Sequence, residues 1–337
     1  MDLPIIRKEN NFSAIRMACC FGIVYEHIGV LSGWNIPMLN IRMFMVRVFF
    51  CLSGFWVTYS YLKSSSVIEY FKKRIRRIIP QYWLVVVLQF LLGALFNLGI
   101  KYWKSVYSWK YLICNMLFMN FLCPSIPGVF EQNYYGPAIN GALWTMKIEV
   151  MFYILLPVLM ALLYKTQSEK SRNCILGCIY MFSYIYYLFF TYNEKYLLDS
   201  RLVNQLPAYM TFFVAGMIYL LNFDFFRKME RVFIIPAVVL LVEQICIRDY
   251  YGYVLLPMAL IIVVVWLALS VSYAGCIVDY SYSLYLVHFP IVQLCVSVGI
   301  MELPMTLVLI LVVFMITISA FLLRQAGIVC ERRMQNI

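Results

Sequence analysis

Charged residues are scarce in this chain: of its 337 residues only 13% are Asp, Glu, Lys or Arg, whereas 64% are hydrophobic. A soluble globular domain has about a quarter charged residues and about half apolar ones, so this composition excludes an ordinary soluble protein. The apolar residues form long runs, close to the roughly 20 residues that a membrane-spanning helix requires. The sequence therefore predicts an all-α fold, a polytopic transmembrane helical bundle.

Several sequence motifs of soluble enzymes are absent too. The chain contains no P-loop, no HExxH, no glycine-rich dinucleotide turn and no paired aspartates, so nucleotide and metal chemistry lack support. Its 11 cysteines include no CxxC pair, and most lie in apolar runs as small hydrophobic side chains. We expect no metal site and no tightly bound cofactor. The net charge of +11 suits loops beside anionic lipids, so the lipid bilayer is the expected partner and nucleic acid is not.

Apolar runs recur along the whole chain and predict about ten spans. Their approximate bounds are 12–32, 43–62, 79–100, 143–164, 174–192, 207–223, 232–247, 253–273, 279–299 and 304–324. We see no internal repeat and no soluble segment, which predicts one transmembrane domain over residues 1–337. The first run leads into further spans and lacks a convincing cleavage site, so a cleavable signal is not expected.

Lys and Arg are distributed unevenly among the segments that join these runs. Of the 27, 17 lie in segments on the side of the N-terminus and seven in segments on the opposite side. Cytoplasmic loops carry the excess of Lys and Arg, and an even number of spans returns the chain to its starting side. Both termini are therefore predicted to be cytoplasmic, and the expected location is the cytoplasmic (inner) membrane, as a multi-pass protein.

Histidine is nearly absent as well, and the two in the chain are His27 and His288. His27 shares the apolar run 15–30 with Arg16. Their spacing of 11 residues is close to three helical turns, which puts both on nearly one face, about 16 Å apart along the axis. Ionisable groups at membrane depth are costly and indicate function, and an imidazole can act as a general base. The alternative is a snorkelling arginine and a buried, hydrogen-bonded histidine.

Small residues mark the second run, in the stretch FFCLSGFWVTYS (49–60). Ser53 and Gly54 would let a neighbouring helix approach closely. Ser53 is not in a GxSxG turn, so a serine nucleophile is poorly supported. Close packing is the favoured interpretation, and Ser53 is kept as a secondary candidate for the site.

A basic cluster precedes the third run, in YFKKRIRRIIPQYW (70–83). Arg74 and Arg77 are three residues apart and share a face if the segment is helical. With Lys73 they could bind phosphates from the cytoplasmic side. The alternative is the ordinary positive charge of a cytoplasmic loop. Pro80 is expected to start the third span, where its missing N–H costs nothing.

Polar groups also enter the fourth predicted span, in NGALWTMKIEVMFYILLP (140–157). Glu149 and Lys147 both lie near its start. They could neutralise each other, or Lys147 could lie at the membrane interface. Glu149 is slightly deeper and is the favoured functional group, with Trp144 as a secondary candidate.

A final polar stretch is DYSYSLYLVHFP (279–290). Ser281, Tyr285 and His288 are spaced so that they line one helix face. A stripe of aromatic residues packed in apolar surroundings explains the same pattern equally well. Tyr285 and His288 are secondary candidates for the site.

The longest segment outside the predicted spans is 101–142, expected on the outer side. Its apolar piece 111–123 is too short to span a bilayer and is expected to be re-entrant or interfacial. The following residues are rich in Pro, Gly and Asn and predict a loop. Long loops in compact proteins are usually functional.

Taken in order, these stretches resemble the acyltransferase-3 family of membrane O-acyltransferases, which modify cell-surface glycans. The matching stretches are NNFSAIRMACCFGIVYEH, FFCLSGF, KRIRRIIPQYW, PGVF, NGALWTMKIEV and SYSLYLVHFP. Each is weak alone, but their order along nearly the whole chain is specific. Nothing in the chain resembles the SGNH hydrolase-like domain of longer relatives.

The resemblance implies a ten-helix acyltransferase domain that uses acyl-CoA, usually acetyl-CoA, as a co-substrate from the cytoplasm. The acceptor would be a hydroxyl of a glycan or lipid-linked sugar. His27 would be the catalytic histidine and Arg16 its essential partner. Arg74 and Arg77, with Lys73, would bind the donor.

Further implications concern the acid and the departures from the family pattern. Glu149 would be the family's acid after the Trp. Ser13 stands where many relatives carry Asp, three residues before the arginine. Val150 and Met151 replace polar residues that are common after the Glu.

The expected activity is therefore O-acetyl transfer to a cell-surface or exported polysaccharide. Neutral His27 would take the proton of the acceptor hydroxyl, which attacks the thioester. Arg16 would stabilise negative charge on the donor or the oxyanion, and Arg74 with Arg77 would anchor the CoA phosphates. Glu149 would orient His27 or the acceptor hydroxyl.

Two other functions fit a polytopic chain. A carrier, such as a flippase of lipid-linked oligosaccharide or a small-solute transporter, would also show many spans and buried charges. Inverted repeats or paired broken helices would favour a carrier, and the sequence shows neither. A glycan polymerase is weaker, because Glu131 is the only carboxylate in the 101–142 loop, which has no arginine. A homo-oligomer is compatible with each function.

Overall fold

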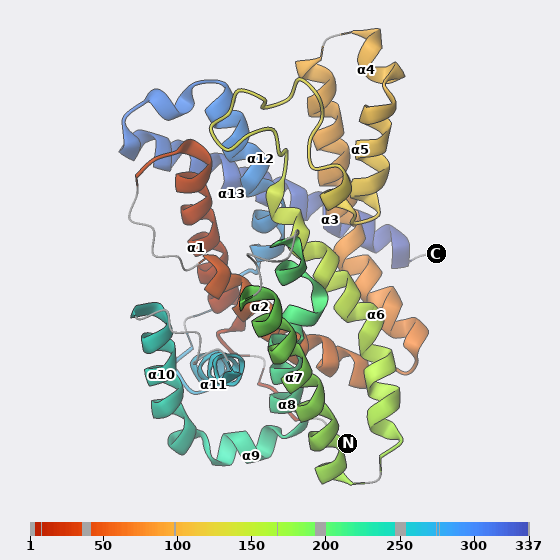
Figure 1. The fold of residues 1–337 in the computed structure, drawn as a ribbon, viewed down its shortest axis with the longest axis vertical. Coiled ribbons are helices and arrows are strands. Elements are labelled where there is room, and N and C mark those ends of the chain that lie inside the picture. The colour runs from red at the N-terminus through yellow and green to blue at the C-terminus, as the bar shows by residue number, and fades with distance from the viewer. Residues whose placement is uncertain are drawn as a thin grey trace. The chain divides into compact units, whose positions relative to one another are not determined.

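The computed structural model describes residues 4–7, 9–35, 42–97, 99–166, 168–192, 200–246, 254–273, 275 and 277–335. Within these residues every regular element is a helix, which confirms the predicted all-α class (Figure 1). Lys8, Lys195 and Arg248 entered the charge count that predicts the topology, and they lie outside the described residues.

Each of the ten predicted apolar runs lies mainly on one described helix. These helices are α1 (Phe12–Ser32), α2 (Arg42–Leu62), α3 (Val67–Phe96), α6 (Trp144–Tyr164), α7 (Glu169–Tyr192), α8 (Leu206–Leu221), α10 (Glu230–Cys246), α11 (Leu256–Leu269), α12 (Ser281–Ser297) and α13 (Met305–Gln335). Six helices in the described part of the chain, α1, α2, α3, α6, α7 and α13, are long and apolar enough to cross a membrane. The exact count of ten spans and the side of the termini stay predictions.

Short helices occupy the segments between several of these. They are α4 (Ile100–Lys104), α5 (Val106–Met116), α9 (Phe223–Lys228) and the 3-10 turns η1 (Asn120–Leu122), η2 (Gly141–Leu143), η3 (Ser200–Asn204) and η5 (Ile300–Glu302). The 11 residues of α5 are too few to cross a bilayer. Between η1 and η2 the chain forms turns and irregular loop, as the Pro, Gly and Asn content predicts.

Helix α3 corrects the expectation that Pro80 starts a helix. The helix begins at Val67, so Pro80 lies in its interior. A capping arrangement explains the earlier start: Glu69 N donates to Ser66 Oγ at 3.1 Å, while Glu69 Oε2 accepts from Ser65 N at 2.6 Å. This satisfies the backbone N–H of Glu69 in the first helical turn and that of Ser65 just before the helix. The basic cluster 72–77 is consequently helical.

The contacts within the chain define two compact units, each made of three segments. Unit 1 comprises Met1–Cys19, Ile41–Phe71 and Ile148–Ile277, and unit 2 comprises Cys20–Asn40, Lys72–Lys147 and Val278–Ile337. The division passes through α1, α3 and α6. A single domain over 1–337 stays a prediction.

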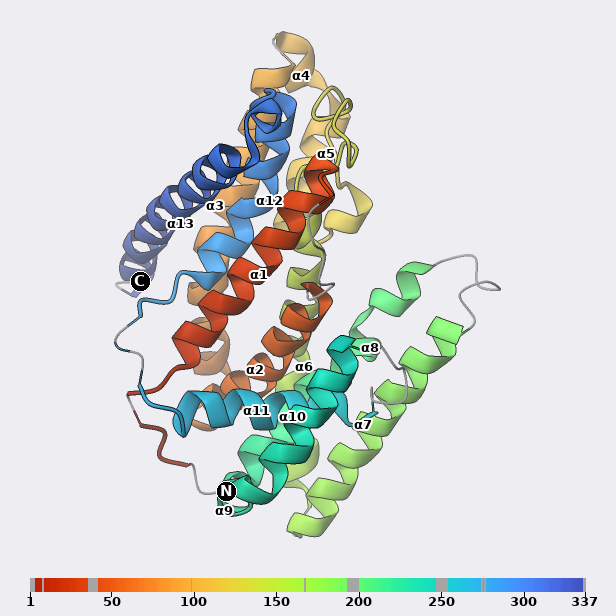
Figure 2. The same cartoon turned by 90° about the vertical axis from the view of Figure 1, so that its left-hand side faces the viewer.

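In unit 1, α2 and α8 meet at two glycines. A Cβ atom at Gly54 would lie 1.9 Å from the carbonyl O of Phe213, and one at Gly216 would lie 2.2 Å from the carbonyl O of Cys51. Only a residue without a Cβ permits this approach, which confirms the packing role expected for the small residues of α2. Next to this pair, α7 lies beside α8, as Figure 2 shows.

In unit 2, α12 lies beside α1 and runs parallel to it (Figure 2). Cys20 Sγ on α1 lies 3.4 Å from Ser281 O on α12. Seven residues further along both helices, His27 meets His288. Equal steps on both helices mean that they run in the same direction.

Helix α3 of unit 2 also runs parallel to α12. Tyr282 OH donates to Ile78 O at 3.0 Å. Twelve residues further along both helices, Leu294 packs against the apolar cluster that contains Phe90. The cluster also includes Val129 and Ile139, so it fixes the loop between η1 and η2 to these helices.

Candidate active site

The two histidines of the chain meet inside unit 2. His27 on α1 is 8% exposed, and His288 on α12 is 0% exposed. His27 Nδ1 lies 3.0 Å from His288 Nε2, and the ring centroids are 4.9 Å apart. The second ring nitrogen of His288, Nδ1, lies 3.2 Å from the carbonyl O of Leu284. Each histidine was a candidate, but their pairing was not predicted.

These contacts determine where the ring protons of a neutral pair lie. A backbone carbonyl only accepts hydrogen bonds, so His288 Nδ1 carries a proton and donates it to Leu284 O. Neutral His288 then has no proton on Nε2, which accepts from His27 Nδ1–H. Neutral His27 therefore carries its lone pair on Nε2. The nitrogen of His27 that can take a proton is Nε2.

Aromatic and hydroxyl groups surround this pair. The ring centroid of Phe289 lies 5.5 Å from that of His27, and the ring centroid of Tyr285 lies 5.6 Å from that of His288. Tyr285 OH is 2.7 Å from Thr145 Oγ1 and donates to Ala142 O at 2.9 Å. Tyr285 is thus brought to the pair as a candidate. Thr145 and Phe289 were missed, although both lie within the stretches that the sequence singled out.

The basic cluster lies on the part of α3 that belongs to unit 2. Arg74 is buried, Lys73 is half-buried and Arg77 is exposed. The predicted helical segment is confirmed, but the two arginines differ in their access to solvent. The hydrogen bond from Tyr282 to Ile78 puts these two residues at about the same height along the parallel helices. Arg74 lies four residues before Ile78, and His288 lies six residues after Tyr282. At the rise per residue of an α-helix, Arg74 is therefore about 15 Å from the histidine pair along the helix axes.

Glu149 lies in unit 1, where it accepts hydrogen bonds from two hydroxyls. Ser53 Oγ donates to Glu149 Oε1 at 2.7 Å, and Tyr153 OH donates to the same oxygen at 2.6 Å. Ser53 and Tyr153 are both buried. Ser53 therefore contacts a carboxylate in addition to lying in the packed face of α2. Tyr153 was missed, although it follows Glu149 by four residues, one helical turn.

Three other candidates have contacts of their own. Arg16 is half-buried in unit 1, and its Cζ lies 5.9 Å from the ring centroid of Trp56. Lys147 is in unit 2, with Nζ 4.5 Å from the ring centroid of Phe121. Trp144 is half-buried and begins α6. Roles for Arg16 and Glu149 beside His27 stay predictions.

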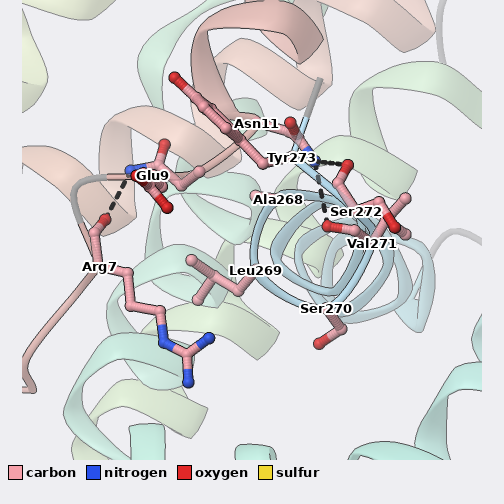
Figure 3. Close-up of a pocket in the computed structure, with 10 residues that line it drawn as sticks. Arg7, Glu9, Asn11, Ala268, Leu269, Ser270, Val271, Ser272 and Tyr273 are labelled. Atoms are coloured by element: carbon pink, nitrogen blue, oxygen red, sulfur yellow. Dashed lines mark hydrogen bonds between the residues drawn. The ribbon is translucent and has the colours of Figure 1, made fainter. Parts of the chain in front are cut away.

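A pocket of about 550 Å³ lies in unit 1, and none of these candidates lines it. Asn11, which lines it, donates through Nδ2 to Ser272 O at 3.1 Å, and its N–H donates to Ala268 O at 2.9 Å. Figure 3 shows Asn11 at the end of α11, with Arg7 on another side of the pocket. The last carbonyls of a helix lack partners within it, so Asn11 satisfies them. No group of three or more metal-ligating side chains occurs in the described residues.

Comparison with known sequences identifies the family. The family model for the acyltransferase domain matches residues 9–324. The chain belongs to the acyltransferase-3 family. The matched region of this acyltransferase-3 protein contains every candidate residue, from Arg16 to His288.

Two curated relatives are similar over part of their length. Nodulation protein 10 of Rhizobium leguminosarum bv. viciae is 25% identical over 199 residues, which cover 56% of this chain and 53% of that protein. The O-acetyl transferase of Shigella phage Sf6 is 26% identical over 160 residues, which cover 46% of this chain and 47% of that protein. The chain thus spans about half the length of the curated relatives it matches. No solved structure matches it.

Proposed function

We propose that this acyltransferase-3 protein transfers an acetyl group from cytoplasmic acetyl-CoA to a sugar hydroxyl of a cell-surface or exported polysaccharide, within the cytoplasmic membrane. Family membership supports acyl transfer, and the similarity to a phage O-acetyl transferase supports an acetyl group. The observation that carries the proposal is the buried pair of His27 and His288. Its geometry assigns the lone pair of neutral His27 to Nε2, which is the nitrogen that accepts a proton in the proposed reaction.

The reaction starts at His27 Nε2. This nitrogen removes the proton of the acceptor hydroxyl, while the hydroxyl oxygen attacks the thioester carbonyl carbon. The C–O bond forms, the C–S bond breaks, and the CoA thiolate takes the proton back from His27. During the step His27 carries a positive charge, and its Nδ1–H donates to His288 Nε2, which stabilises that charge. His288 acts here as a positioning residue.

In this proposal acetyl-CoA binds at the first turns of the part of α3 that belongs to unit 2. Lys73, Arg74 and Arg77 would hold the phosphates of CoA, since guanidinium and ammonium groups bind phosphate oxygens well. The pantetheine arm of CoA carries the thioester away from these phosphates and can bridge a separation of about 15 Å along the helices. Arg16 would stabilise the negative charge of the donor or of the oxyanion. Glu149, held by Ser53, would orient the acceptor hydroxyl or His27.

The test compares His27→Ala with wild-type protein in lipid nanodiscs. Because only proton transfer is removed, acetyl-CoA binding by calorimetry should be unchanged. Acetyl transfer in host cells that produce each variant, measured by mass spectrometry of their surface glycan, should fall by about 10² to 10⁴-fold. Tyr107→Ala, at an exposed residue of α5, is the control and should keep both acetyl-CoA binding and acetyl transfer.

Near-normal transfer by His27→Ala would exclude His27 as the base. If wild-type protein shows neither acetyl-CoA binding nor CoA release with any glycan acceptor, the carrier function is favoured instead.

A further inference from the structure

The loop between η1 and η2 is fixed to α12 by the buried side-chain amides of Asn133 and Gln293. Gln293 is 0% exposed, and its Nε2 donates to the carbonyl oxygens of Gly136 and Ala138, both at 2.9 Å. Asn133 Nδ2 donates to Gln293 Oε1 and to Gln293 O, both at 2.8 Å. Burying an amide is costly unless its polar groups are hydrogen-bonded. Here both hydrogens of each side-chain amide nitrogen are donated to oxygen atoms. The loop is therefore held rigidly on both sides of residues 134 and 135.

The two residues between these attachment points are exposed tyrosines. Tyr134 is 74% exposed and Tyr135 is 47% exposed. Glu131 and Gln132, which precede Asn133, are exposed too. A tyrosine that packing needs is normally buried, whereas exposed tyrosines on a rigid loop supply broad contact area at a small cost in conformational entropy.

One of these tyrosines lies close to the histidine pair. The ring of Tyr135 meets Phe289 edge to face, with centroids 5.7 Å apart. His27 is also a neighbour of Phe289, with ring centroids 5.5 Å apart. Tyr134 packs on Gly33, just beyond the end of α1, because a Cβ there would lie 2.9 Å from its ring. The exposed Tyr135 and the proposed base thus contact the same aromatic ring, Phe289.

We propose that Tyr135, with Tyr134, forms a platform that binds the acceptor sugar ring beside His27; this inference rests on the proposed function. A sugar presents apolar C–H faces and hydroxyls, which match the faces of tyrosine rings and the polar groups of Glu131 and Gln132. The donor cations on α3 lie at the opposite end of the same parallel helices. Donor and acceptor therefore reach His27 from opposite ends of unit 2.

A lipid-facing role fits this loop less well. Irregular backbone is not exposed to the hydrocarbon core of a bilayer, because its polar groups would lack partners there. The loop exposes a carboxylate and a carboxamide next to the tyrosines. Its tyrosines consequently face water or the polar membrane interface, where a glycan can reach them.

Saturation-transfer NMR on the full chain in nanodiscs tests the platform without CoA. The probes are the methyl glycosides of glucose, N-acetylglucosamine and rhamnose. At least one glycoside should receive saturation from the wild-type protein. Tyr135→Ala should weaken its binding about fivefold to tenfold, whereas Tyr135→Phe should retain it, because stacking needs the ring and not the hydroxyl. Tyr107→Ala, at a residue that is 69% exposed, is the matched control and should bind normally.

The proposal is overturned if no glycoside receives saturation, if Tyr135→Ala binds as well as wild type, or if Tyr107→Ala loses as much. The proposed reaction is tested separately by CoA release. If the protein releases no CoA but its glycoside binding depends on Tyr135, the proposed reaction is rejected and the platform is kept. If the protein transfers acetyl groups from acetyl-CoA but its glycoside binding does not depend on Tyr135, only the platform is rejected.

Discussion

At the residue scale, one backbone carbonyl determines the chemistry of both histidines. Leu284 O holds the proton of His288 on Nδ1, which turns His288 Nε2 into an acceptor for His27. In a low-dielectric interior such an oriented acceptor would stabilise the imidazolium of the proposed reaction more than water would. A replacement of His288 can preserve function only if it also offers His27 Nδ1–H an acceptor.

His288→Gln and His288→Leu should differ in activity although both fill the site. The side-chain oxygen of Gln can reach the place of His288 Nε2 and accept from His27 Nδ1–H, whereas Leu leaves that N–H without an acceptor. We expect His288→Gln to keep much of the wild-type kcat. His288→Leu should lose about 10² to 10³-fold in kcat with little change in KM for acetyl-CoA.

The measurement is a pH profile of kcat for both variants. A positioning role predicts that His288→Gln keeps a bell-shaped or sigmoidal profile like that of wild type, while the profile of His288→Leu is displaced. Equal losses in the two variants, with unchanged profiles, would show that His288 only fills space.

At the element scale, the approach of α2 and α8 depends on the absence of two Cβ atoms. Gly54→Ala and Gly216→Ala each place a methyl group within 1.9 to 2.2 Å of a facing carbonyl oxygen. Helices cannot relax around a backbone clash without moving apart, so each change should destabilise the protein by about 1–3 kcal/mol. Thermal unfolding in detergent measures the effect as a lower Tm.

Gly177→Ala on α7 is the matched control, since a Cβ there meets nothing within 4 Å. Alanine also favours helix over glycine by up to about 1 kcal/mol, so its Tm should stay equal or rise slightly. If Gly54→Ala and Gly216→Ala behaved like this control, the close approach of α2 and α8 would be wrong.

At the scale of the whole molecule, the remaining question is which end of each helix faces the cytoplasm. The excess of Lys and Arg predicts that both termini are cytoplasmic and that the 101–142 segment is outside. Fluorescent protein fused after residue 337 should therefore fluoresce, because it folds in the cytoplasm. Alkaline phosphatase fused after residue 132 should be active, and the same enzyme fused after residue 168 should be inactive.

The opposite result for all three fusions would invert the topology. It would also place Arg74 and Arg77 on the outer side, which cytoplasmic acetyl-CoA does not reach. An inactive phosphatase fusion after residue 132, with the others as expected, would instead mean that the 143–164 run does not cross the membrane.

Several features were determined by the sequence alone, because they depend on local physics. Apolar composition and run length predicted the all-α class and the positions of the long helices, since a chain in lipid must satisfy its backbone groups within each helix. The pair Ser53–Gly54 predicted close packing, and the order of the motifs predicted the family. The start of α3 could also have been found, because Ser66 and Glu69 form a capping-box pattern.

Only the tertiary structure decided which side chains meet. His27 and His288 are separated by 261 residues, and helical periodicity says which face a side chain occupies but not which helix lies opposite. The same holds for Ser53 with Glu149, 96 residues apart, and for Asn133 with Gln293. The protonated nitrogen of His27 follows from such contacts, since a ring tautomer is set by the partner of the other nitrogen. The sequence thus determined the helices and the family, and the packing of α1 on α12 decided the geometry of the histidine pair.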